Sequence, residues 1–249
     1  MRGQQVLGKI VDANIREWMK REESFIKRQR EKELAEPLPL ITISRDRGSG
    51  GGKIAKFLAD KIGFTLIDKE FLEHIAKRAE VRKEVVALVE EKARQSIFKW
   101  LTTLKKTEKL SPNEYFNHLL EVVTAISQLG GAILVGRGAN FILEPKTALR
   151  VRIVCPLAVR IQKFVEADKT TPKAAEKIIV KKDDERKAFV GEWFRKDIND
   201  PDYYDLEINT NFLDIETAAA LILHAYNKKF NLPEKEIGIR LARKSGPQT

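Results

Sequence analysis

Four glycines and a lysine lie close together near residue 50, and their types and spacing suit the binding of a phosphate group. Gly48, Gly50, Gly51 and Gly52 fall within five positions and are followed by Lys53. Glycine backbone adopts positive φ angles and approaches an anion closely, so successive N–H groups can point at it. A helix beginning there adds further free N–H groups. The pattern predicts a phosphate-binding loop, and a flexible loop without a ligand is the alternative.

The loop departs from the Walker motif, G-x-x-x-x-G-K-[ST], whose lysine and hydroxyl act on phosphates and magnesium. With Gly52-Lys53 as the G-K pair, Arg47 replaces the first glycine and Ile54 replaces the hydroxyl. A second register places Gly51 at the lysine position and Lys53 at the hydroxyl position. In either register the cation comes from Lys53 or from a flanking arginine. We therefore predict phosphate binding by Arg45, Gly48, Ser49, Gly50, Gly51 and Gly52, with Lys53 as a catalytic cation.

The elements that must position this loop are strands and helices in alternation. LPLITIS (38–44), FTLI (64–67) and AILV (132–135) are continuous apolar runs with helix-like sequence between them. Such runs are typical of parallel strands that are covered on both faces. LRVRIV (149–154) and YDLEIN (204–209) instead alternate apolar with polar residues, which predicts one wet face and a place toward one side of the sheet. The fold class is therefore α/β.

The remaining segments predict one main domain with appendages. Residues 69–129 have helical periodicity and predict an insertion of several helices. Residues 169–200 are rich in Lys, Asp and Arg with few apolar anchors, which suggests a solvated, mobile element. We expect the domain to span 37–230, with a helical extension at 1–36 and a basic tail at 231–249.

The N-terminal extension carries apolar residues three and four positions apart, a spacing that makes one stripe on a helix. They are Val11, Ile15, Trp18, Met19, Phe25 and Ile26. The stripe either packs on the main domain or forms the contact of a homodimer.

Six segments in a fixed order carry a family resemblance. They are ITISRDRGSGG with the helix after it, FTLIDKEFLEHIA, ILVGRGANFIL (133–143), LRVRIVCPLAVRI (149–161), the D-x-x-R-x-x-F of Asp183, Arg186 and Phe189, and DPDYYDLEINT (200–210). Over about residues 40–226 the chain resembles the cytidylate kinase-like proteins. The resemblance implies a P-loop nucleoside monophosphate kinase fold: a five-stranded parallel sheet with helices on both faces, an acceptor-binding region and a lid. It also implies ATP or another nucleoside triphosphate with Mg²⁺, and a CMP-like or related small-molecule phosphate acceptor.

The resemblance also implies roles for residues at the strand ends. Arg137 matches the arginine of the D-G-R-D segment that binds the acceptor phosphate, and it follows a predicted strand, where ligands bind in such sheets. Val135 and Gly138 stand where that segment carries aspartates, so we assign no metal ligand. Asp68 follows the second strand and either contacts the acceptor nucleoside or caps the next helix.

The lid is expected to supply further cations. Arg186 matches the family's lid arginine, and a guanidinium suits phosphate oxygens through paired hydrogen bonds. Arg195 and Lys196 reinforce it, and Arg160 lies near the same cleft on the acceptor side. Lys53, Arg137 and Arg186 are therefore the predicted catalytic residues, although a charge in a lid is commonly just part of a solvated face.

Composition limits the class of protein. The 249 residues include 46 Lys+Arg and 36 Asp+Glu, a net charge of +10, and 43% hydrophobic residues, which excludes a disordered chain. The single cysteine, Cys155, cannot form an internal disulfide, and no apolar window is long enough for a membrane helix. We therefore expect a cytoplasmic protein without a membrane partner.

The basic charge favours anionic partners, and it leaves a second reading of function open. In that reading a kinase-like module binds a nucleotide or nucleic acid without transferring phosphate. Nucleic acid is the weaker option because aromatic residues are not interleaved with the basic ones. The three histidines have no metal-ligand spacing, and no G-x-S-x-G segment supports a serine hydrolase.

Overall fold

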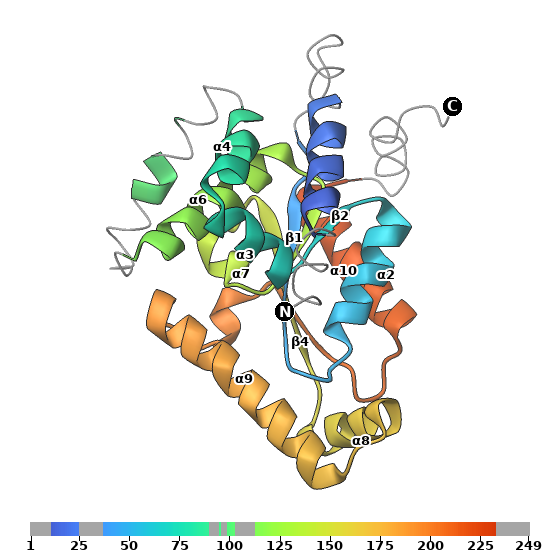
Figure 1. Ribbon diagram of the computed structural model, residues 1–249. Helices are drawn as coiled ribbons and strands as arrows, with labels where there is room; N and C mark the ends of the chain where they lie inside the picture. The colour runs from blue at the N-terminus through green and yellow to red at the C-terminus, as the bar shows by residue number, and fades with distance from the viewer. Residues whose placement is uncertain (1–10, 25–36, 90–94, 96–98, 103–112, 233–249) are drawn as a thin grey trace.

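A sheet of five parallel strands forms the centre of the computed structural model (Figure 1). The structure describes residues 11–24, 37–89, 95, 99–102 and 113–232. The strands lie side by side in the order β2-β3-β1-β4-β5. Their bounds are β1 Leu40–Arg45, β2 Thr65–Ile67, β3 Ala132–Val135, β4 Ala148–Val154 and β5 Leu206–Asn209. The predicted five-stranded parallel sheet is confirmed, and both alternating strands lie on one side of β1.

The strand order brings the chemically interesting residues to one edge. β1 pairs with β3 on one side and with β4 on the other, and both pairs are parallel. The carboxyl ends of these strands therefore meet at the same edge of the sheet, where ligands bind in folds of this kind. Arg45 ends β1, Asp68 follows β2 and Arg137 follows β3.

Two apolar layers cover the two faces of the sheet, as predicted. α2 (Gly51–Ile62) and α10 (Ile215–Phe230) pack against one face, which includes Ile41 and Ile43. Leu40 points to the opposite layer, since neighbouring residues of a strand face opposite sides. That layer includes residues of α3 (Lys69–Lys77), α4 (Ala79–Ala87), α6 (Glu114–Leu129) and α7 (Ala139–Ile142). Figure 1 shows the two groups of helices on either side of the strands.

The helix over residues 11–24 packs onto this second layer. Ile15 and Trp18 are 1% and 2% exposed, and the Trp18 ring meets the Phe71 ring edge-on at 5.6 Å between centroids. The apolar stripe thus contacts the core of its own chain, and the homodimer stays a prediction. Several predicted features lie outside the described residues: Phe25, Ile26, the start of the 1–36 extension and the tail after residue 232.

The polar side of β4 differs from the sequence expectation of a wet face. Arg152 is 4% exposed, and its guanidinium donates hydrogen bonds to Ser44 Oγ (3.2 Å) and Asp46 Oδ1 (2.7 Å). Arg150 is half-buried and pairs with Asp205, 2.8 Å from Nη2 to Oδ1. The prediction was wrong here because carboxylates distant in sequence pair with these arginines.

Two helices form an arm at the carboxyl edge of the sheet (Figure 1). α8 (Leu157–Asp168) is followed by α9 (Pro172–Phe194), and a short 3-10 helix, η1 (Pro201–Tyr203), leads to β5. The Thr171 side chain caps α9 by accepting a hydrogen bond from the backbone N–H of Ala174. α9 occupies most of the segment predicted as a lid. Across the described residues, no helix combines the length and apolarity needed to cross a membrane.

Candidate functional site

The glycine loop between β1 and α2 presents open backbone N–H groups. Gly48 and Gly50 have φ angles of +86° and +83°, the left-handed region that favours glycine. Gly50 caps α2 without any side-chain hydrogen bond, and the first helical bond runs from the N–H of Ile54 to the carbonyl of Gly50 (3.0 Å). Among the described residues, no acceptor is bonded to the backbone N–H groups of Gly51, Gly52 and Lys53. These groups can therefore bind an anion.

The loop lines a cleft of about 920 Å³, here called the loop cleft. Its walls are the residues from Arg45 to Ile54, Lys163 and Phe164 of α8, Arg186 of α9, and Thr210 and Asp214 around the start of α10. Lys53 is exposed and lines this cleft, and its predicted catalytic role stays a prediction. Ser49 also lines it, but its hydroxyl is used inside the fold: Oγ donates to the carbonyl of Asp46 at 3.0 Å and is buried. Phosphate binding by Ser49 stays a prediction, and its buried hydroxyl is not free to take part in it.

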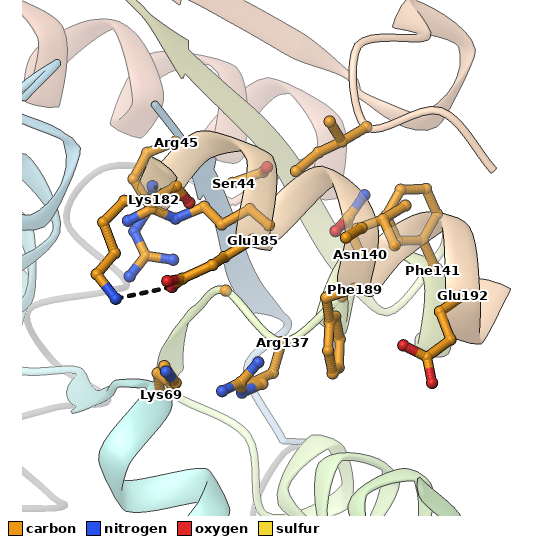
Figure 2. Close-up of a pocket in the computed structure, with 16 residues that line it drawn as sticks. Ser44, Arg45, Lys69, Arg137, Asn140, Phe141, Lys182, Glu185, Phe189 and Glu192 are labelled. Carbon is orange, nitrogen blue, oxygen red and sulfur yellow. Dashed lines mark hydrogen bonds and ion pairs between the residues drawn. The ribbon is translucent and has the colours of Figure 1, made fainter. Parts of the chain in front are cut away.

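A second cleft of about 430 Å³, the strand-end cleft, lies between the end of β3, the start of α3 and α9 (Figure 2). Its cationic lining residues are Arg45, Lys69, Arg137, Lys182 and Arg186. Apolar and polar groups complete it, among them Asn140, Phe141 and Phe189. The carboxylates of Glu185 and Glu192 also line this cleft, and Glu185 pairs with Lys182 (2.7 Å), so the five cations face two carboxylates. The surplus of positive charge favours an acceptor that carries phosphate or several carboxylates.

Arg137 lies on the turn after β3, between Gly136 and Gly138. Its φ angle of 53° is unusual for a residue with a side chain, so the backbone is strained at Arg137. The guanidinium lies over the Phe189 ring, 4.7 Å from its centroid, and Nη2 donates a hydrogen bond to Glu73. Figure 2 shows the Arg137 side chain between Lys69 and Phe189. Its Nε is buried and has no hydrogen-bond partner among the described residues.

Burial and mutual repulsion act on the cations of the strand-end cleft. Burial lowers the pKa of Arg45 to about 10, and the charge of Arg186 acts in the same direction. Burial likewise lowers the pKa of Arg137, with the Glu70 carboxylate opposing it, and lowers that of Lys69, beside Arg137. With a pKa of about 10, the Arg45 guanidinium remains protonated at neutral pH. Such a cluster is relieved when an anion binds between its members.

Arg45 and Arg186 line both clefts and also a smaller cavity of about 240 Å³ behind them. Arg186 is held from within α9, because its Nη1 donates to Asp183 Oδ1 (2.9 Å) and to the carbonyl of Lys182 (3.2 Å). Burial lowers the pKa of Arg186, and the Asp183 carboxylate opposes this effect. The two guanidinium groups therefore stand where the clefts meet.

Asp183 connects α9 to the glycine loop. Its Oδ1 accepts a hydrogen bond from the backbone N–H of Arg47 (2.7 Å), and its Oδ2 accepts one from Arg160 Nη1 (2.5 Å). Asp183 and Phe189 were predicted only as parts of a motif, with no role of their own. The i, i+3, i+6 spacing of that motif was the available signal, because it places all three residues near one face of a helix.

Four other predicted site residues either form bonds within the fold or lie away from the clefts. Arg160 is 9% exposed and donates to the carbonyls of Cys155 (2.7 Å) and Arg47 (3.0 Å), so it supports the loop instead of reaching the acceptor. Asp68 caps α3 by accepting from the Phe71 N–H at 2.9 Å, the second of its two predicted roles. Arg195 ends α9 and is exposed, and Lys196 contacts Tyr203 at 3.1 Å; neither lines the three cavities described above.

The site was also tested for a protein-held Mg²⁺. Ile54, 1% exposed, stands at the position of the Walker hydroxyl in the Gly52-Lys53 register. Asp46, the carboxylate beside the loop, bonds to Arg152, and Glu73 bonds to Arg137. Within the described ranges, no three His, Cys, Asp or Glu residues are grouped to hold a metal ion. The Walker hydroxyl position and these two carboxylates therefore offer no unpaired oxygen-bearing side chain to a metal ion.

Comparison with known proteins supports both the fold and the family. The model of a family described as the "Cytidylate kinase-like family" matches residues 40–212. A crystal structure of an uncharacterized protein from Eubacterium ventriosum is 22% identical, with a TM-score of 0.60 over 77% of this chain and 99% of that chain, which shows a shared fold. A shikimate kinase from Acinetobacter baumannii in complex with shikimate is 14% identical, with a TM-score of 0.38 over 76% and 93% of the two chains. No curated protein matches the sequence.

Proposed function

The chain belongs to the cytidylate kinase-like family, and from that premise we propose that it transfers a phosphoryl group from ATP or another nucleoside triphosphate to a small phosphate acceptor. A nucleoside monophosphate such as CMP is the first acceptor to consider. The donor phosphates occupy the loop cleft, and the acceptor occupies the strand-end cleft.

The observation that carries this proposal is the pair of guanidinium groups shared by the two clefts. Arg45 and Arg186 line both of them. Phosphoryl transfer asks for positioning and for neutralisation of charge on the moving group, with little covalent help from protein. Two fixed cations where donor and acceptor meet supply that neutralisation without reorganisation during the reaction.

The remaining residues position the two substrates. The free N–H groups of Gly51 to Lys53 bind donor phosphate oxygens, and the exposed Lys53 side chain adds a cation. Arg137, braced by Phe189, binds the acceptor phosphate, and Lys69 adds charge on the same side. α9 covers the meeting point of the clefts and limits the access of water, which would otherwise accept the phosphoryl group. Mg²⁺ accompanies the triphosphate as its chelate.

The buried Ile54 favours the second candidate, a kinase-like module that binds nucleotide without transfer. A chain of this kind would keep the anion-binding loop but lose the hydroxyl expected to act on a metal. The two candidates make different predictions about turnover and the same prediction about binding.

The test combines turnover with binding on the full chain. Purified protein is mixed with ATP, Mg²⁺ and one acceptor from a panel of nucleoside monophosphates, CMP first, and products are followed by ³¹P NMR. We expect product with at least one acceptor, and a roughly 100-fold lower turnover for Arg186→Met, the typical cost of losing one fixed charge donor. Arg16→Met is the control, because Arg16 is exposed on the helix over 11–24.

The outcomes separate the candidates. ATP binding without product from any acceptor supports the non-transferring module. A folded protein that neither binds ATP nor forms product contradicts both. Equal turnover of Arg186→Met and Arg16→Met would remove the shared guanidinium groups from the mechanism.

A further inference from the structure

The end of β3 shows where a metal-binding group is missing and what stands in its place. In kinases with a Walker loop, Mg²⁺ is held by the loop hydroxyl and by an aspartate. Here the hydroxyl position falls on Ile54 in one register of the loop and on Lys53 in the other, and neither carries a hydroxyl. The end of β3 offers the apolar Val135 followed by Gly136. Gly136 lies beside β1, because its N–H donates to the carbonyl of Ile43 at 3.1 Å.

The space beside Gly136 is filled by the Arg45 guanidinium. A side-chain carbon built on Gly136 would overlap Nη1 of Arg45, and its φ of +86° also disfavours a side chain. A side chain at this position would therefore require the Arg45 guanidinium to move. Gly51 of the glycine loop also lies close to Arg45, since a side-chain carbon on Gly51 would lie 2.7 Å from Cβ of Arg45. Two glycines thus make room for one arginine.

Two carboxylates near Arg45, those of Asp46 and Asp183, are engaged by other cations, while those of Glu70 and Asp68 act on its charge without forming an ion pair with it. Asp46 bonds to Arg152, and Asp183 bonds to Arg160 and Arg186. By contrast, across the described residues the Arg45 guanidinium forms no hydrogen bond or ion pair. Its five N–H donors and its charge are available to a ligand at the meeting point of the clefts.

We propose that the guanidinium of Arg45 replaces a protein-held metal ion as the cation between donor and acceptor phosphates. The proposal rests on the phosphoryl-transfer function stated above. In the step, an oxygen of the acceptor phosphate forms a bond to the terminal phosphorus of the donor, and the bond from that phosphorus to its bridging oxygen breaks. The electron pair stays on the bridging oxygen of the departing diphosphate. Arg45 donates hydrogen bonds to oxygens of the moving group and offsets their charge.

The same assignment indicates how metal acts on substrate binding. Because the protein binds the phosphates through Arg45 and backbone N–H groups, removal of Mg²⁺ should leave the affinity for ATP nearly unchanged. A metal ion held by both protein and nucleotide would instead couple the two binding events, and each would strengthen the other.

Calorimetry with ATP, in excess Mg²⁺ and then in excess EDTA, measures that coupling without any turnover. For the wild-type chain we expect the two dissociation constants to agree within about threefold, because no protein ligand is lost with the metal. Arg45→Met should weaken ATP binding at least about tenfold in both buffers, and Arg45→Lys should restore part of it, since it keeps the charge but not the fork of donors. Arg16→Met should bind like wild type. As a second readout, the affinity of Mn²⁺ for ATP, followed by electron paramagnetic resonance, should not rise when protein is added.

Three results would overturn the assignment of Arg45. They are an affinity for ATP that falls tenfold or more in EDTA, a Mn²⁺ affinity that rises with protein, and a folded Arg45→Met that binds ATP as wild type does. Should Arg45→Met fail to fold, the comparison of the two buffers on wild-type protein and on Arg45→Lys decides the question. Failure of the transfer reaction itself is recognised separately, as ATP binding without product from any acceptor.

Discussion

The link between α9 and the glycine loop predicts a measurable change when Asp183 is replaced by Asn. The substitution keeps the shape of the side chain but removes its charge and puts a donor where one acceptor stood. Asp183 accepts from the Arg47 N–H (2.7 Å), from Arg160 (2.5 Å) and from Arg186 (2.9 Å). An amide can serve two of these three donors at most.

The magnitude follows from these bonds and from the exposure of the carboxylate. A hydrogen bond to a charged group contributes about 1.5–3 kcal/mol. The Asp183 side chain is 26% exposed, so solvent screening reduces that value, and Asn keeps one acceptor oxygen. We therefore expect Asp183→Asn to lower the free energy needed to open the glycine loop from α9 by about 1.5–3 kcal/mol in total.

Hydrogen exchange of the Arg47 amide is the assay, because this N–H bonds directly to the Asp183 side chain. A local cost of about 1.4 kcal/mol or more should speed its exchange at least about tenfold. Amides in the centre of β1 should change less, since the sheet keeps all its bonds. The control is Asp184→Asn, the neighbouring exposed residue of the same helix, which removes the same charge. Equal exchange of Arg47 in both variants would refute the reasoning that Asp183 fastens the loop.

Two further predictions concern packing and pH. Gly51→Ala should destabilise the chain by about 1–3 kcal/mol in urea unfolding, because its new carbon would lie 2.7 Å from Cβ of Arg45. Gly52→Ala, whose new carbon meets nothing within 4 Å, should be neutral or stabilising by up to about 1 kcal/mol, and the reverse order of the two variants would contradict this packing. Burial alone would raise the pKa of Asp205, but its hydrogen bonds from Arg150 and Lys229 hold it below the ordinary 3.8. The stabilisation that this carboxylate provides is therefore present above pH 3.8 and is lost as the pH falls through its lower folded-state pKa. Asp205→Asn should lower the free energy of unfolding by about 0.5–1 kcal/mol at pH 7. It should also lessen the decrease of that free energy below about pH 4, and a series of urea melts measures both effects.

Much of the frame could be predicted from residue patterns because burial on two faces dictates them. The runs at 38–44, 64–67 and 132–135 cover β2, β3 and all of β1 except its last residue, and they are mostly apolar or β-branched for that reason. The alternating pattern of β4 was harder to interpret, since it reports only that every second residue is polar. Whether Arg152 faces water or a carboxylate depends on Asp46, which lies 106 residues away in the chain.

The same physical limit applies to the arginines of the site, which look alike in the sequence. Arg160 and Arg45 both flank glycine or apolar segments, and both have a side chain long enough to reach a phosphate. The acceptors around each side chain distinguish the two residues. Arg160 donates to two carbonyls and a carboxylate, so its hydrogen-bonding capacity is largely used inside the fold. Arg45 forms no such bond with the described residues. Because the donors of Arg45 are only partly buried and have no acceptor in the described part of the fold, they are open to an anion, whereas those of Arg160 already support the loop.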